Sequence, residues 1–97
     1  MKRNQKFDME VGVIFLKDVK GRVTAYCPAL ELTTYGKSLS HAQKMFDEAL
    51  ELFVDDVSGR DAWDEVFEEL GWSKQNNKWL PPQLISTQLQ TISVRRN

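Results

Sequence analysis

Two periods of apolar residues divide the chain. Every second position from residue 9 to residue 15 is apolar, and "RVTAYC" at residues 22–27 alternates again. A period of two predicts β-strands that bury one face. The segment "DVKGR" between them contains Gly21, which can adopt the positive φ that a tight turn needs. We therefore expect an antiparallel hairpin over residues 8–27.

A third strand and a long helix are expected next. Pro28 has no N–H for a ladder and should end the second strand, while "LELTTYG" predicts a short third strand that closes at Gly36. Ser38 is a good helix cap, and the apolar period beyond it becomes helical until Gly59 interrupts it. The apolar stripe of this helix consists of Ala42, Phe46, Ala49, Leu50, Phe53 and Val57.

A second, shorter helix is predicted between an Asp61 cap and a C-terminal stop at Gly71. Its apolar stripe consists of Trp63, Val66, Phe67 and Leu70. The tail that follows predicts a turn at Asn76-Asn77. Beyond Pro81-Pro82, one or two short strands are expected from Leu84, Leu89 and the alternating residues 91–94.

These elements predict a small α+β fold in βββααβ order, with two helices on one face of an antiparallel sheet. We expect a single domain over residues 1–97, with a core in residues 1–70 and a tail in residues 71–97. The tail shows no pattern of a DNA-recognition helix, so DNA binding is not expected. The side chains expected to form the core are Phe15, Tyr26, Phe46, Ala49, Leu50, Phe53, Val66 and Phe67.

Composition changes this picture little. The chain is 41% hydrophobic and 28% charged and holds three Trp and five Phe, which is typical of a folded protein and not of a disordered one. Its single Cys cannot form an intramolecular disulfide, whereas small secreted domains usually need several. No apolar run approaches the roughly 20 residues of a membrane-spanning helix. We expect a soluble cytoplasmic protein.

The charges are distributed unevenly. Residues 47–69 hold ten of the fourteen acidic residues and one base, a net charge of −9, while the segments before and after each carry +4. Such a block is either a solvated helical face or a surface that steers a basic partner. The candidate steering residues are Asp55, Asp56, Asp64 and Glu68. Trp72 and Trp79 are candidate anchors because Trp is enriched in interface hot spots, although either ring could simply close the core.

The residues of a catalytic site are largely missing from the sequence. Cys27 as a nucleophile would need His41, the only His, together with an orienting group. One Cys and one His do not have the spacing of a zinc site, and the five glycines form no phosphate-binding loop. We therefore expect a binding module without catalytic residues, metal or cofactor.

The segment Ala-Tyr-Cys-Pro-Ala-Leu at residues 25–30, followed by Gly36, Ser38 and a helix containing "DEALELF", resembles the HicB family of antitoxins. The resemblance covers residues 7–57. The chain departs from the family pattern at residues 31–33, where many relatives have Pro-Gly-Cys, and at His41, where they often have Glu. The resemblance implies a partial RNase H-like fold without its catalytic carboxylates. It also implies binding to a small basic ribonuclease toxin, HicA, whose active site the antitoxin occludes.

Three functions follow as hypotheses. The first is a HicB-like antitoxin or an orphan relative of that family. The second is a self-assembling scaffold without a toxin, in which the tail strand pairs between subunits; an unpaired strand of this kind leads us to expect a homodimer or a higher homo-oligomer. The third is nucleic-acid binding through the basic residues near the two termini, which are Lys2, Arg3, Lys6, Arg95 and Arg96.

Overall fold

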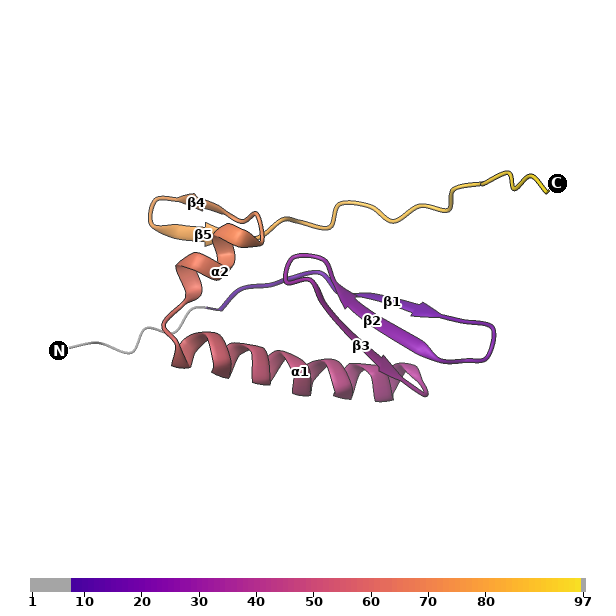
Figure 1. The fold of residues 1–97 in the computed structure, drawn as a ribbon, viewed down its shortest axis with the longest axis horizontal. Coiled ribbons are helices and arrows are strands. Elements are labelled where there is room, and N and C mark those ends of the chain that lie inside the picture. Colours follow the sequence, from indigo (N-terminus) through magenta and orange to yellow (C-terminus); the bar gives the residue numbers. More distant parts are fainter. Residues whose placement is uncertain (1–7, 97) are drawn as a thin grey trace.

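The computed structural model describes residues 8–96, in which a three-stranded sheet precedes two helices and a small hairpin (Figure 1). This order confirms the predicted α+β class, but the two strands that follow the helices lie before Pro81-Pro82 and not beyond them as expected. The elements in chain order are β1 (Ile14–Lys17), β2 (Val23–Cys27), β3 (Leu32–Gly36), α1 (Leu39–Gly59), α2 (Trp63–Glu69), β4 (Ser73–Gln75) and β5 (Lys78–Leu80).

The sheet is antiparallel in the order β1-β2-β3. The predicted turn is confirmed, with Gly21 at a φ of 90°. The predicted first strand was too long, because pairing begins only at Ile14, opposite Tyr26. In the same register residue 12 would face Pro28, which has no N–H to donate, so the ladder cannot continue far beyond Ile14.

Helix α1 begins as predicted. The Ser38 hydroxyl accepts a hydrogen bond from the His41 backbone N–H at 3.1 Å, which satisfies one of the unpaired donors of the first turn. A Cβ atom at Gly36 would lie 2.3 Å from the Ala42 backbone nitrogen, so β3 and α1 come together too closely for any side chain at residue 36. This contact fixes α1 over β3 and, less extensively, over β2 (Figure 1).

The inner face of β2 forms the centre of the core. Val23, Ala25 and Cys27 are buried under α1 and the adjoining turn, together with Phe46 of α1 and Phe67 of α2. The other buried members of this cluster are Ala29, Leu30, Ala42 and Trp72.

The predicted core is partly wrong. Phe46 and Phe67 are buried, and Leu50 and Phe53 pack against the cluster as half-buried residues. Phe15 is 36% exposed, because it lies on β1, outside the main area that α1 covers. The alternation of β2 places Tyr26 on the face opposite Ala25, so its ring lies outside the helix-covered core. Ala49 and Val66 are half-buried and lie outside the cluster.

Helix α2 begins at a different cap from the predicted one. Its N-cap is Ala62, without a side-chain hydrogen bond, and Asp61 instead adopts a φ of 51° in the tight corner after α1. The corner is closed by the Asp61 and Ala62 backbone N–H groups, which donate to carbonyls of the last turn of α1. Gly71, at a φ of 81°, follows the C-cap as predicted.

The hairpin β4–β5 is joined to α2 through Trp79, which contacts Phe67 and donates a hydrogen bond to Asp64. Asn76 and Asn77 both have positive φ, as the predicted turn requires. Phe67 of α2 is in contact with three tryptophan rings and so joins α2 to this hairpin. It stacks on Trp72 at 4.0 Å between centroids and lies 5.1 and 5.7 Å from the Trp63 and Trp79 rings.

Residues 81–96 form neither helix nor strand, so the strands predicted beyond the prolines are absent from this segment. The tail leaves the hairpin as an extended chain, and the longest dimension of the molecule is 64 Å (Figure 1). Within residues 8–96, no helix combines the length and the apolar content needed to cross a bilayer.

Candidate protein-binding surface

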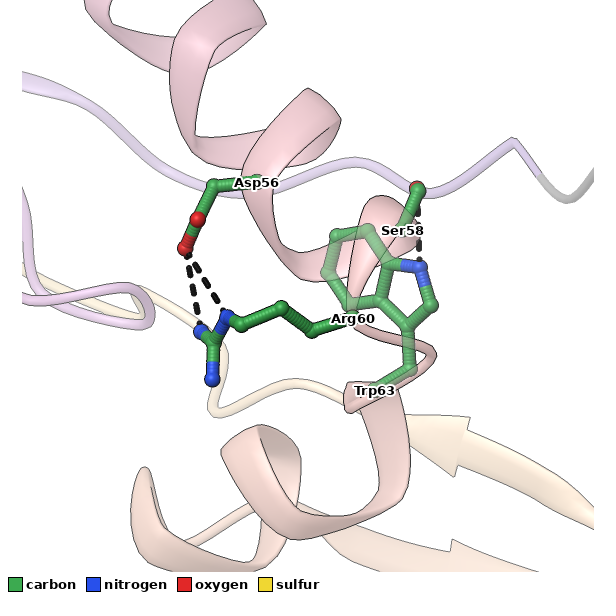
Figure 2. Close-up of polar contacts among 4 residues, drawn as sticks. All are labelled: Asp56, Ser58, Arg60 and Trp63. Carbon is green, nitrogen blue, oxygen red and sulfur yellow. Dashed lines mark hydrogen bonds and ion pairs between the residues drawn. The ribbon is translucent and has the colours of Figure 1, made fainter.

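The corner between α1 and α2 is held by two side-chain contacts (Figure 2). Arg60 donates from Nε and Nη2 to Oδ2 of Asp56 at 3.3 and 3.0 Å. The Trp63 indole N–H donates to the Ser58 hydroxyl at 3.1 Å. Arg60 is the only base in the acidic block, and its charge offsets that of Asp56.

Two of the four predicted steering residues have a side-chain partner within the described residues, and two do not. Asp56 is paired with Arg60, and Asp64 accepts a hydrogen bond of 2.7 Å from the Trp79 indole N–H. Asp55 and Glu68 are exposed, and neither side chain makes a hydrogen bond or an ion pair within residues 8–96. Asp55 and Glu68 are thus the two that can direct their full charge toward a partner.

The two predicted tryptophan anchors both hold the fold together. Trp72 is 7% exposed, and its indole N–H donates to the Ala29 carbonyl oxygen at 2.8 Å, which ties the β2–β3 turn to the end of α2. Trp79 is half-buried, bonded to Asp64 and crossed by Lys74 at 5.5 Å from its ring. Trp72 is therefore too buried to anchor a partner, and Trp79 can offer only part of its ring.

An apolar depression of about 430 Å³ lies where residues 9–11, α1 and α2 meet, and we call it the aromatic hollow. Ser58 is the one polar residue among those that line it. Met9 and Val54 are 43% and 39% exposed, while the buried rings of Phe67 and Trp72 close the inner side. The remaining lining residues include Val11, Leu50, Phe53 and Trp63. None of the residues predicted as partner-binding from the sequence, apart from Trp72, lines this surface.

One signal in the sequence could have pointed to the hollow. Val54 follows Leu50 by four residues, so it lies beside the predicted stripe and widens it beyond what the sheet covers. An apolar stripe broader than its covering layer leaves apolar residues facing solvent. Met9 could not have been found this way, because its position depends on the path of residues 8–13 outside any strand.

A second depression, of about 530 Å³, adjoins the first between α1 and the segment that leads into β1, and we call it the β1 hollow. The two share Met9, Val11 and Leu50. Phe15 and Phe46 also line the β1 hollow, on the strand side and the helix side respectively. It exists because α1 packs on β3 and β2, leaving the helix-facing side of β1 with little cover.

The possible nucleophile pair is not assembled. Cys27 is fully buried at one end of β2, while His41 adjoins Gly36, which pairs with Val23 at the other end of that strand. Four residues of strand separate the two ends by roughly 13 Å. The His41 Nδ1 atom accepts from the Lys37 backbone N–H at 2.9 Å. Within residues 8–96, no group of three or more Cys, His, Asp or Glu side chains is placed to hold a metal ion.

Basic residues gather near the N-terminal end of α1, at the opposite end of the helix from its acidic corner with α2, where Asp55, Asp56 and Asp64 lie. Lys20, Arg22, Lys37 and His41 surround a shallow depression of about 390 Å³. Arg22 pairs with Asp18 at 3.6 Å, which leaves the two lysines as its unpaired charges among the described residues. Of the terminal basic residues considered for nucleic-acid binding, Arg95 and Arg96 lie at the exposed end of the tail; Lys2, Arg3 and Lys6 lie outside the described residues.

Comparison with known proteins leaves the family of this chain open: no family model matches it, and no curated protein or solved structure is significantly similar to it.

Proposed function

We propose that this chain is a non-catalytic cytoplasmic binding module, a HicB-like antitoxin that neutralises a small basic ribonuclease of the HicA type by covering its active site. The observation that carries the proposal is the position of the aromatic hollow, an open apolar surface that lies beside the acidic corner of α1 and α2. An apolar centre with a charged rim is the usual composition of a protein interface.

The acidic residues at the end of α1 are not there for helix stability. The C-terminal end of a helix carries a partial negative charge, so acidic side chains are unfavourable in the last turns and basic ones are favourable. Asp55 and Asp56 lie at that end of α1, and its last turn contains no base. The Arg60 pairing offsets the charge of Asp56 only. A surface that attracts a basic partner explains why Asp55 stands at this position.

The two parts of the surface have different tasks in this proposal. Exposed charges such as Asp55 and Glu68 raise the association rate and respond to salt, because they act over a distance before contact. Desolvated apolar side chains slow dissociation. Val54, Met9 and Trp63 in the aromatic hollow take the anchoring role that the sequence had suggested for Trp72 and Trp79.

The proposal is tested by co-expression with the small basic protein of roughly 60–80 residues that a HicB-like gene has as its neighbour. Expression of that neighbour alone should arrest growth, and co-expression of this chain should restore it. Purified chain should inhibit RNA cleavage by the neighbour in equimolar amounts. Growth arrest that persists on co-expression, or the absence of such a neighbour, contradicts the proposal.

The alternative function, a self-assembling scaffold without a toxin, is favoured by one observation. Residues 82–96 are exposed and form neither helix nor strand, as expected of a segment that binds outside its own chain. An assembly that forms readily, together with a chain that restores no growth, would favour this alternative over the antitoxin.

A further inference from the structure

The tail contains strand-forming side chains that are largely exposed in the described structure. Leu89 is 104% exposed and Ile85 is 91% exposed, while Ile92 and Val94 are each more than three-quarters exposed. Leaving aliphatic side chains in water forfeits the free energy that burial would provide, roughly 25 cal/mol for each Å² of apolar surface. The composition of this segment is therefore at odds with its environment.

The composition is also unlike that of a flexible terminal segment. Residues 79–94 contain no charged residue, although 28% of the whole chain is charged. Disordered segments are typically rich in charge and poor in β-branched residues, whereas "LISTQLQTISV" has the reverse bias. Uncharged segments rich in β-formers tend to pair with other strands. Residues 84–94 thus have the composition of a strand that lacks a neighbour.

The sheet offers an edge that lacks a strand. Among the described residues, β1 pairs only with β2, so the other side of β1 presents unpaired backbone N–H and C=O groups. Such an edge is a template for an added strand, and native proteins usually block it with charges, prolines or a covering element. β1 reads Ile-Phe-Leu-Lys, and only Lys17 carries a charge.

The β1 hollow lies at the start of the same strand, between residues 9–15 and α1. In a strand added beside β1, every second side chain would point toward α1 and lie over Phe15 and Phe46. The other side chains would point to the opposite face of the sheet, beside Leu16, which is 58% exposed. In an extended tail, apolar side chains would lie on both faces of the strand. Ile85 and Leu89 would lie on one face, and Leu84, Ile92 and Val94 on the other. A single added strand would thus cover both exposed faces of β1.

The tail does not lie on its own edge. Leu84 packs on Gly12, with its Cβ 3.0 Å from where a Gly12 side chain would begin, but contact with the body ends there. Leu80 and Pro81 each precede a proline, which holds both residues extended. Stiff hinges of this kind favour exchange of a segment between copies over a return to the same copy.

We propose that two copies of this chain exchange their tails, with residues 84–94 of each copy added as a strand to the β1 edge of the other. The exchange is reciprocal, so the dimer has two-fold symmetry and no open β1 edge remains. Eleven tail residues and the nine that line the β1 hollow make twenty per copy, at the lower end of the roughly 20–30 residues per side of a stable interface. The inference does not depend on the proposed toxin.

The first test measures the mass of the full-length chain by light scattering across a dilution series. The parent should be a dimer at micromolar concentration. The double variant Ile85→Asp/Leu89→Asp should raise the dimer dissociation constant more than tenfold, while its thermal unfolding under dilute conditions stays that of the parent monomer. The matched control, Val19→Asp/Leu52→Asp, adds the same charge at two exposed apolar positions away from the tail and the hollow and should remain dimeric. A monomeric parent, or equal dissociation of both variants, overturns the proposal.

The second test asks which surfaces meet. Cys27 is fully buried, so an introduced cysteine is the reactive thiol in each chain. A Phe15→Cys chain is mixed with chains that carry Cys at residue 87, 89 or 91. Oxidation should give a disulfide-linked heterodimer that depends strongly on which tail position is used. Uniformly low yield at all three positions contradicts the exchange. A doubly substituted Phe15→Cys/Leu89→Cys chain that closes on itself as a monomer shows that the tail folds back, and also contradicts it.

Discussion

The two halves of the sheet have similar apolar patterns but different environments. On β2, Val23, Ala25 and Cys27 are buried, while Phe15, the β1 residue paired with Ala25 on the same face, is 36% exposed. The difference arises at Gly36, whose lack of a side chain lets α1 pack on β3 and β2 and so leaves β1 with little cover. Apolar periodicity therefore identifies a face that must be covered, and helix placement decides whether the chain covers it or leaves it for a partner.

The largest expected effect is a difference in stability between alanine variants of two phenylalanines that line the β1 hollow. Phe46→Ala should lower the free energy of unfolding by about 3–5 kcal/mol, because it leaves a cavity in the buried cluster. Phe15→Ala should cost about 1 kcal/mol or less at concentrations where the chain is monomeric, since its ring is already partly in water. Urea unfolding of both variants measures the contrast. Equal losses would mean that β1 is as well covered as β2.

A pair of glycines tests what places α1. Gly36→Ala should destabilise the fold by about 2–3 kcal/mol, because its Cβ atom would meet the backbone of Ala42 and push the helix from the strand. Gly59→Ala has nothing within 4 Å of the new Cβ and should be neutral or stabilising by up to about 1 kcal/mol. Thermal unfolding distinguishes them. A Gly36→Ala variant as stable as the parent would show that the close approach is not required.

The N-terminal cap of α1 should contribute less than either pair. Ser38→Ala removes the acceptor for the His41 N–H and should cost about 1 kcal/mol. Ser40→Ala, two residues further on, leaves that acceptor in place, removes only the 3.3 Å contact between the two hydroxyls, and should cost about a few tenths of a kcal/mol. The two variants are compared by urea unfolding. If the free energy of unfolding fell by the same amount in both variants, the loss at Ser38 would not be due to the helix cap.

The smallest effect concerns rates and separates paired from unpaired acids. Reversing the two unpaired acids, in Asp55→Lys/Glu68→Lys, should slow association with a basic ribonuclease several-fold at low salt and little at high salt. Asp64→Asn, which keeps an oxygen to accept from Trp79, should have a smaller effect on the rate. Stopped-flow mixing at two salt concentrations measures both. An association rate that is independent of charge and salt would reduce the acidic block to a solvated surface.

Local chemistry made much of the fold predictable. Ser38 as a cap, Gly71 as a stop and Asn76-Asn77 as a turn each depend on a few neighbouring residues, and the structure has all three as expected. The Asp61 cap was wrong because the corner after α1 forms backbone hydrogen bonds that place Asp61 at positive φ before α2 begins.

The predictions that were wrong concern residues whose burial or pairing depends on contacts with distant parts of the chain. Nothing near Trp72 in the sequence indicates that its indole would reach the carbonyl oxygen of Ala29, 43 positions earlier, and become part of the core. The tail was predicted as strand because residues 84–94 have strand composition, yet a strand needs a neighbour to pair with. The aromatic hollow depends on how residues 8–13 cross α1 and α2, a path that no period in the sequence specifies.

The central claim, that the aromatic hollow is the partner-binding surface, is tested most directly by two substitutions on α1. Val54→Arg introduces a charged side chain into the hollow, and Leu52→Arg introduces the same charge at a 71% exposed position outside it. The dissociation constant of the complex with the basic ribonuclease is measured for both by calorimetry, with the unfolding temperature as a check on the fold. We expect Val54→Arg to weaken binding at least tenfold and Leu52→Arg to change it less than threefold. Similar values for the two variants would place the interface elsewhere and contradict the account.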